Sequence, residues 1–267
     1  MPTKLPTVND RGIIRPLGHR PPRDGRNVSS AVPRTAIPRS QLVAFDLRTI
    51  VAPIKVKDQN GKGACNGHAA ASVAEWARWL AGMTHVDLSA WMVYAILCNG
   101  IDNGSNIGDA LTLMSKTGTC PDKDVAYGSI NPRAVSAANR TAALQNRVEI
   151  GTKLLTFDDM LTSAALRRPF NFSLRASDNF GNLDSDGCIP VTPGVGNHAI
   201  TGGLGLKQRK SNGEWLILWQ NSWTTKWGDN GFAWVSEGSI KRQQYFEAYD
   251  VEAMVDSDGG NNPPPLI

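Results

Sequence analysis

The sequence of 267 residues lacks an apolar run long enough to cross a membrane. Its longest nearly unbroken apolar stretch, Leu88–Cys98, has eleven residues, whereas a membrane-spanning helix needs about 20. The segment Met1–Leu17 contains only Ile13–Ile14 between charged residues, which is shorter than the apolar region of a signal peptide. We therefore expect no membrane association, no Sec-dependent secretion and an intracellular, reducing compartment.

Cysteine is also scarce, and no two of the four cysteines form a C-x-x-C pair; they are Cys65, Cys98, Cys120 and Cys188. This spacing gives little support to a structural zinc site. Two disulfides are compatible with the count, but the absence of a signal peptide favours reduced thiols. We predict neither a metal nor a cofactor, and we find no repeat at the periods of solenoids or propellers.

The net charge of +4 is unevenly distributed along the chain. Residues 1–40 hold eight basic and two acidic residues, so this segment carries +6 and the other 227 residues carry −2. Seven of the 16 prolines also lie in residues 1–40, which excludes a long helix or a central strand there. We call this segment the basic arm.

Three interpretations of the basic arm remain open at this point. Its composition favours a solvated tail. It is also compatible with a docking element for an anionic partner, or with a segment that contacts the cleft of its own chain as a built-in inhibitor. We expect removal of residues 1–36 to leave the fold intact.

After the arm, helical patterns precede strand patterns. Residues 63–150 contain apolar residues at the three-to-four spacing of a helix face, and Leu88–Asn99 and Ile107–Ser115 predict further helices. The segments Ala199–Leu206 and Trp215–Trp219 predict a β-hairpin, because Asn212-Gly213 between them is a strong turn signal.

This order predicts an α+β protein with two lobes in a domain over residues 41–255. The helical lobe spans about 63–150 and the β lobe about 151–255, with the active-site cleft between them. Residues 256–267 are polar and rich in glycine, asparagine and proline, so we expect a flexible tail.

Three short segments contain the residues that suggest chemistry. A glycine-rich turn places Cys65 in the first turn of a predicted helix, where free amides and the helix dipole lower a thiol pKa. Gln59, six residues upstream, is positioned to offer an amide donor beside the Cys65 N–H, as in an oxyanion hole. A lone cysteine in such a helix is more often a small buried hydrophobe, so the other two segments decide the interpretation.

The second segment has His198 at the start of an apolar strand, and the third contains Asn221-Ser222-Trp223 followed by Trp227-Gly228 and Gly231-Phe232. The order Gln, Cys, His, Asn and this tryptophan-rich string resemble the papain family of cysteine peptidases, especially its bacterial and viral branch. The resemblance covers about residues 40–255. It implies the papain-like two-lobe fold, with a helical N-terminal lobe and an antiparallel β C-terminal lobe.

The resemblance also implies roles for individual residues. Cys65 is then the nucleophile that forms a thioester acyl-enzyme, His198 the acid and base, Asn221 the residue that orients His198, and Gln59 the oxyanion donor. Trp223 covers the bond between His198 and Asn221. Substrate contacts are implied at Gly63, Gly104, Ser105, Trp223 and Trp227.

The function that follows is a cysteine endopeptidase acting on extended polypeptides, without metal or cofactor. Two alternatives keep the same fold: an isopeptidase or amidase with the same Cys–His pair, or a non-catalytic binding or structural protein. The slightly acidic body argues against nucleic acid as a partner of the peptidase domain.

The sequence departs from the family at several positions. Asn66 stands where the family has an aromatic residue after the nucleophile, Lys62 replaces a cysteine, and the basic arm is shorter than the usual inhibitory prosegment.

For His68, one helical turn after Cys65, we expect a packing role. Asn182–Gly187 imitates the start of a calcium loop but lacks the later glutamate, so we expect a surface loop.

Overall fold

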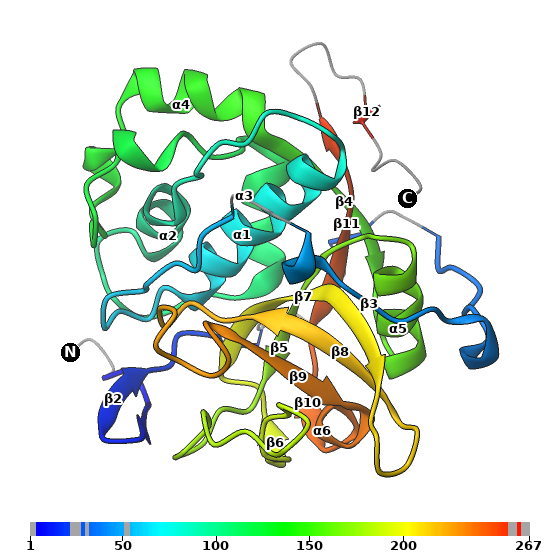
Figure 1. The fold of residues 1–267 in the computed structure, drawn as a ribbon. Coiled ribbons are helices and arrows are strands. Elements are labelled where there is room, and N and C mark those ends of the chain that lie inside the picture. Colours follow the sequence, from blue (N-terminus) through cyan, green and yellow to red (C-terminus); the bar gives the residue numbers. More distant parts are fainter. Residues whose placement is uncertain (1–3, 22–27, 30–31, 51–53, 256–260, 263–267) are drawn as a thin grey trace.

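The computed structural model describes residues 4–21, 28–29, 32–50, 54–255 and 261–262, and it has helices on one side and a sheet on the other (Figure 1). This is the α+β arrangement that the order of sequence patterns predicts. None of the helices in these ranges is long and apolar enough to span a membrane. All four cysteines are free, buried thiols.

The helical lobe is built around α1 (Cys65–Leu80), all of whose residues except Trp79 are buried. The helices α2 (Ala90–Cys98) and α3 (Ile107–Lys116) pack against α1. Gly67 allows the close approach of α2, because a Cβ at this position would lie 2.8 Å from the Ala90 carbonyl oxygen. The lobe is completed by α4 (Ala137–Ala143) and the short 3₁₀ helices η3 (Asp122–Asp124), η4 (Pro132–Ala134) and η5 (Leu144–Asn146).

Side-chain caps fix the starts of these helices. The hydroxyl of Ser89 accepts from the Met92 N–H and the side chain of Asn106 accepts from the Asp109 N–H. Such caps satisfy amides that have no partner within the helix. The helices predicted over Leu88–Asn99 and Ile107–Ser115 are therefore confirmed to within about two residues at each end.

The β lobe contains an antiparallel sheet with the strand order β12-β11-β5-β7-β8-β9, to which β3 and β4 add at the sides. Its strands are β3 (Phe45–Asp46), β4 (Arg147–Lys153), β5 (Phe170–Leu174), β7 (His198–Gln208), β8 (Trp215–Gln220), β9 (Phe232–Ser236), β11 (Ala248–Val255) and β12 (Asn261–Asn262). The strands β6 (Gly194–Val195) and β10 (Gln243–Tyr245) form a separate parallel pair. The predicted hairpin is present as β7 and β8, with Gln208 opposite Trp215.

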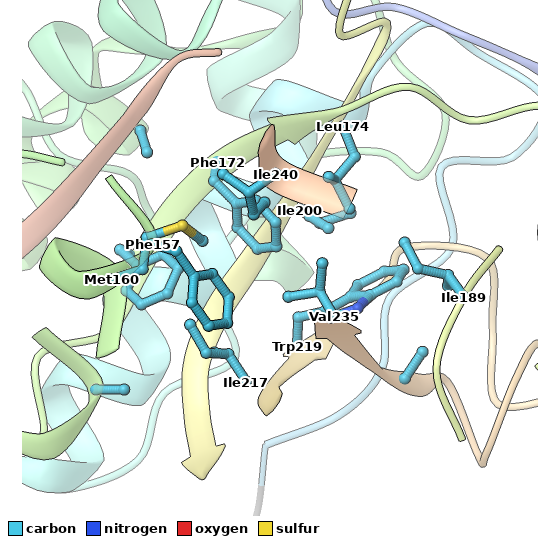
Figure 2. Packing of buried hydrophobic residues seen from close by; sticks show 14 of the residues in the cluster. Phe157, Met160, Phe172, Leu174, Ile189, Ile200, Ile217, Trp219, Val235 and Ile240 are labelled. Atoms are coloured by element: carbon cyan, nitrogen blue, oxygen red, sulfur yellow. The ribbon is translucent and has the colours of Figure 1, made fainter. Parts of the chain in front are cut away.

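The helix α5 (Phe157–Ala165) packs on one face of the sheet, and α6 (Glu237–Lys241) follows β9. Figure 2 shows how Phe157 and Met160 of α5 meet Phe172, Ile200 and Ile217 of the sheet. A second apolar cluster surrounds α1 and includes residues of β4, β7 and β11. Both apolar clusters therefore contain residues from segments that are distant in the sequence.

The chain does not divide at one point between the lobes. Phe45–Asp46 lies before the helices in sequence and pairs with β7. β4 begins at Arg147, directly after the helices of the helical lobe, and it pairs with β11 from Tyr249 to Val255 (Figure 1). Of the tail expected over 256–267, Asn261–Asn262 pairs with β11 as β12, and the rest lies outside the described residues.

The described part of the basic arm lies on the body, which differs from the solvated tail that its composition favours. The strands β1 (Thr7–Asp10) and β2 (Ile13–Pro16) form a hairpin, and Val8, Asp10, Leu17 and His19 are buried. Short strands are compatible with the proline content of the arm, because Pro16 stands at the end of β2. The two 3₁₀ helices η1 (Arg39–Gln41) and η2 (Leu47–Thr49) connect the arm to the body.

Arg34 anchors the later part of the arm to the sheet. Its guanidinium forms ion pairs with Asp250 and, at 3.3 Å, with Glu252 of β11. The Asp250 carboxylate is fully buried and also accepts from the Thr152 N–H (2.6 Å) and the Ser163 hydroxyl (2.8 Å). Burial raises the pKa of Asp250, and Arg34 opposes that shift. Removing residues 1–36 would take this partner away, so the structure does not support the expectation that this deletion is harmless.

We expect Arg34→Ala to lower the free energy of unfolding by about 3 kcal/mol, because it leaves a buried carboxylate without its cation. Arg39→Ala is the matched control, since Arg39 pairs with the half-exposed Asp158 and with the partly exposed Glu237, and each such pair contributes about 1 kcal/mol or less. Urea unfolding of both variants measures the difference. Equal losses in the two variants would show that the Arg34 pair has no special role.

Candidate active site

Cys65 is the first residue of α1 and is fully buried. The chain reaches it through a tight turn in which the Lys62 N–H donates to the Gln59 carbonyl (2.9 Å). Asn60 and Gly61 in this turn have φ values of +48° and +63°, a conformation that asparagine and glycine tolerate best. This turn delivers Cys65 to the N-terminus of α1, as the glycine-rich segment predicts.

His198 begins β7, the strand that packs against α1. The Thr201 hydroxyl of β7 donates to the Ala69 carbonyl of α1 at 3.0 Å, and Cys65 and Ala199 belong to one apolar cluster. These contacts bring His198 and Cys65, which come from different lobes, to the same place.

The hydrogen bonds around Asn221 fix the protonation of His198. The Asn221 Oδ1 accepts from the Ser222 N–H (2.8 Å), so His198 Nε2 must donate to the same oxygen, also at 2.8 Å. The proton is then on Nε2, and Nδ1 has no hydrogen-bond partner. Trp223 lies over this pair with its ring 4.6 Å from the His198 ring, and both residues are fully buried.

Gln59 joins the same group of residues through both ends of its amide. Its Oε1 accepts from the Ser222 hydroxyl (2.9 Å) and from the Trp223 Nε1–H (3.0 Å). Its Nε2 therefore points the other way, where it donates to the carbonyls of Lys62 (2.7 Å) and Pro16 (3.1 Å). The four residues implied by the resemblance thus meet at one site, and a donor of Gln59 faces the cleft.

The arm continues from Pro16 through this cleft in an extended conformation. The Ser105 N–H donates to the Gly18 carbonyl and the Arg20 N–H donates to the Ser105 carbonyl, both at 2.8 Å, while the His19 N–H donates to the Asn197 carbonyl at 3.1 Å. His19 and Ser105 form a parallel bridge. This part of the arm therefore binds the backbones of the helical lobe and the β lobe at once.

Glycines make this close fit sterically feasible. A Cβ at Gly18 would lie 1.8 Å from the Gly63 carbonyl oxygen, and a Cβ at Gly104 would lie 2.2 Å from the Gly18 carbonyl oxygen. Of the five implied substrate contacts, Gly63, Gly104 and Ser105 thus touch the arm backbone directly.

Trp223 meets the arm through its ring, whereas Trp227 lies beneath Trp223. The guanidinium of Arg15 lies over the Trp223 ring at 5.3 Å from its centroid, a cation–π contact. Trp227 is fully buried below, at 5.0 Å from the ring of Trp219 and 6.0 Å from that of Trp223. In the arm-bound structure Trp227 therefore supports Trp223 from inside.

The covered site holds its thiol and imidazole in their neutral forms. Burial raises the pKa of Cys65 to about 11, although the N–H groups of Ala199, Gly18 and Asn66 act in the opposite direction. Burial lowers the pKa of His198 to about 4, and the bond to Asn221 opposes that shift. The expectation of a lowered thiol pKa is therefore wrong for the covered site, because the loss of water outweighs the nearby amides.

Sequence reasoning missed several residues that shape the cleft. Tyr94 donates to Asp102 (2.5 Å), which also accepts from the Gly63 N–H (2.9 Å), so the loop before Ser105 is tied to the turn before Cys65. Asn66, noted only as a departure from the family, donates to the Ser105 carbonyl at 2.9 Å. Glu247 faces His19 from the β lobe. Tyr94 and Asp102 lie in the stretch between Cys65 and His198 that also resembles the family, but the sequence predicts no role for either of them, and no motif marks Glu247.

The structure also places His68 and the calcium-like loop Asn182–Gly187. The ring nitrogens of His68 face the carbonyls of Ala64 (2.9 Å) and Asp58 (3.1 Å), and the ring packs on Trp91. In the calcium-like loop, Asp184 and Asp186 pair with Arg209. Within the described residues no cluster of His, Cys, Asp or Glu side chains is suited to hold a metal ion.

Comparisons with solved structures show the same fold at low sequence identity. Xylellain, a cysteine protease from Xylella fastidiosa, matches with a TM-score of 0.70 and 20% identity over 88% of this chain and 95% of its own. Bromelain from Ananas comosus, solved with the inhibitor E64, gives 0.63 and 20% over 80% and 99%. Procathepsin L 3 of Tenebrio molitor gives 0.64 and 17% over 82% and 73%.

No curated protein matches the sequence significantly. The family model described as papain family cysteine protease, however, matches residues 43–253, which is most of the chain. The site residues from Gln59 to Asn221 lie inside this range, and the arm up to Leu42 lies before it. The chain belongs to the papain family of cysteine proteases.

Proposed function

We propose that this protein is a cysteine endopeptidase that cleaves extended polypeptides in the cleft now filled by its own arm. The observation that supports this most directly is the meeting of Cys65, His198, Asn221 and Gln59 beside an extended backbone. That backbone is a peptide bound by Ser105 and Asn197 through main-chain hydrogen bonds. Such bonds are independent of side chains, so the cleft fits many polypeptides.

In this proposal His198 activates Cys65 when the arm is displaced. Water then returns to the cleft, and the burial that keeps both groups neutral is reduced. The proton of the thiol passes from Sγ to the free Nδ1 of His198, and Asn221 holds the resulting imidazolium through Nε2. Trp223 above the ring shields this hydrogen bond from water.

The thiolate attacks the carbonyl carbon of the scissile bond, and the oxygen becomes an oxyanion. Gln59 Nε2, which already donates to a peptide carbonyl at Pro16, donates to it together with the Cys65 N–H. The C–N bond breaks, the amine takes the proton from Nδ1, and a thioester remains. Water then attacks the thioester with His198 as base, which releases the carboxylate and restores the thiol.

The arm acts as an inhibitor in this proposal. Its Gly18 N–H is one of the backbone donors at the Cys65 sulfur. The arm therefore occupies the place beside the nucleophile that a substrate would need. Its hairpin is held upstream by Asp10, which accepts from the Gly181 N–H at 2.6 Å.

We expect Gly18→Ala to raise peptidase activity by about 5- to 150-fold, because an added methyl group against the Gly63 carbonyl costs the bound arm about 1–3 kcal/mol. Ile13→Ala is the control, since Ile13 lies in the hairpin of the same arm and is exposed. Hydrolysis of a fluorescently quenched unfolded polypeptide measures the change. Equal activity of Gly18→Ala and the unmodified chain would contradict the inhibitory role of the arm.

In the Gly18→Ala chain, we expect Cys65→Ala to reduce hydrolysis by roughly 10³-fold or more, because the nucleophile is lost. Cys98→Ala, which removes another buried thiol, is the matched control and should retain activity. If the Cys65→Ala chain stays active on the same polypeptide, another residue performs the attack. If the polypeptide is not cleaved but a branched isopeptide or a simple amide is hydrolysed, the proposed substrate class, extended polypeptides, is wrong.

A further inference from the structure

Tyr94 of α2 is fully buried, and its hydroxyl makes two hydrogen bonds to the loop that leads to Ser105. It donates to Asp102 Oδ1 at 2.5 Å and accepts from the Gly104 N–H at 3.1 Å. Burial, and then the hydrogen bond to Asp102, raise the pKa of Tyr94, so the phenol keeps its proton and remains a donor at neutral pH. One hydroxyl thus fixes both the side chain of Asp102 and the backbone of Gly104.

The Asp102 carboxylate continues this chain of hydrogen bonds to the turn that carries the nucleophile. The same Oδ1 atom accepts from the Gly63 N–H at 2.9 Å, and Gly63 lies two residues before Cys65. The connected groups are therefore the Gly104 N–H, the Tyr94 hydroxyl, the carboxylate and the Gly63 N–H. Hydrogen bonds that are linked in this way strengthen one another inside a protein. The loop is thus held in a fixed position relative to the N-terminus of α1.

This loop is the part of the helical lobe that binds the backbone of the arm. The Gly104 N–H already bonds to Tyr94, so the bonds to the arm are made by the next residue. The Ser105 N–H donates to the Gly18 carbonyl, and the Ser105 carbonyl accepts from the Arg20 N–H, both at 2.8 Å. The place of these two backbone groups therefore depends on how the preceding residues of the loop are held.

We propose that Tyr94 is a positioning residue which, through Asp102, sets where the backbone of Ser105 lies relative to Cys65. This inference rests on the peptidase function proposed above. The positioning serves the arm and a substrate alike, because both are extended peptides that bind Ser105. A change at Tyr94 should therefore release the arm and at the same time weaken the binding of substrate, whereas Gly18→Ala releases the arm alone.

The test compares two reactions of the full-length Gly18→Ala chain. One is kcat/KM for the quenched unfolded polypeptide, and the other is the rate at which iodoacetamide alkylates Cys65, which makes no use of Ser105. Both reactions require the arm to be away, so their ratio removes the effect of a variant on the arm. We expect Tyr94→Phe to lower this ratio about tenfold, mostly through a higher KM, because the loop loses hydrogen bonds that hold it in place.

A second tyrosine–aspartate pair in the helical lobe provides the matched control. The exposed Tyr127 donates to Asp58 Oδ2 at 3.0 Å, so Tyr127→Phe removes a similar bond that does not reach the loop, and the ratio should not change. Asp102→Ala should lower the ratio as Tyr94→Phe does, and the double variant should lose little more than either single variant. An unchanged ratio in a folded Tyr94→Phe chain would overturn the proposal, as would an equal loss in Tyr127→Phe or fully additive losses in the double variant.

Alkylation in the chain with an unmodified arm distinguishes positioning from a general loss of packing. With Tyr94→Phe, the fully buried Cys65 should react about tenfold faster, because the arm is held less tightly. Cys98 and Cys120 belong to the same apolar cluster as Tyr94, so they should keep their slow rates. Equal increases for all three thiols would show a loosened lobe and contradict the proposal. If Tyr94→Phe does not fold, Asp102→Ala, which truncates a partly exposed side chain, decides by the same measurements.

The alkylation measurement also separates this inference from the proposed activity, because it needs no peptide hydrolysis. If no polypeptide is hydrolysed but Tyr94→Phe selectively speeds the alkylation of Cys65 under the unmodified arm, the peptidase function fails and the positioning role stands. If the Gly18→Ala chain hydrolyses the polypeptide but Tyr94→Phe changes neither the ratio nor the alkylation rate, the positioning role fails and the peptidase function stands.

Discussion

The packing of the N-terminus of α1 against β7 is the contact on which the site depends. Cys65 and His198 are the first residues of these two elements, so any shift between the lobes would separate them. The Thr201 hydroxyl bond to the Ala69 carbonyl and the close fit around Gly67 hold α1 in place from both sides. The position of Cys65 relative to His198 thus depends on how the two lobes are fixed against each other.

The same junction explains how the basic arm can cover the site. Ser105 comes from the helical lobe and Asn197 from the β lobe, and each bonds to the backbone of the arm. With the arm in place Cys65 and His198 are fully buried, and this burial raises the pKa of the thiol and lowers the pKa of the imidazole. In the proposed function, this one extended segment excludes substrate and suppresses ionisation of the nucleophile.

The fold and the chemical residues were largely predictable from the sequence because their signals are local. The turn signal Asn212-Gly213 lies between the two strands that it connects. Gln59 and Cys65 are only six residues apart in the sequence. The tertiary contacts were not predictable. The contacts of Arg34 with Asp250 and of His19 with Glu247 form only when the chain has folded. None of these four residues belongs to a motif. The thiol pKa was mispredicted for the same reason, because the burial of Cys65 is a property of the whole folded molecule.

The most direct test of this account is the rate at which iodoacetamide alkylates each cysteine at pH 7, followed by mass spectrometry. In the unmodified chain Cys65 should react slowly, since it is buried and its thiol is neutral. In the Gly18→Ala chain Cys65 should react faster than Cys98, Cys120 and Cys188. If Cys65 reacts rapidly with the arm in place, or no faster than the other cysteines once the arm is displaced, the account is contradicted.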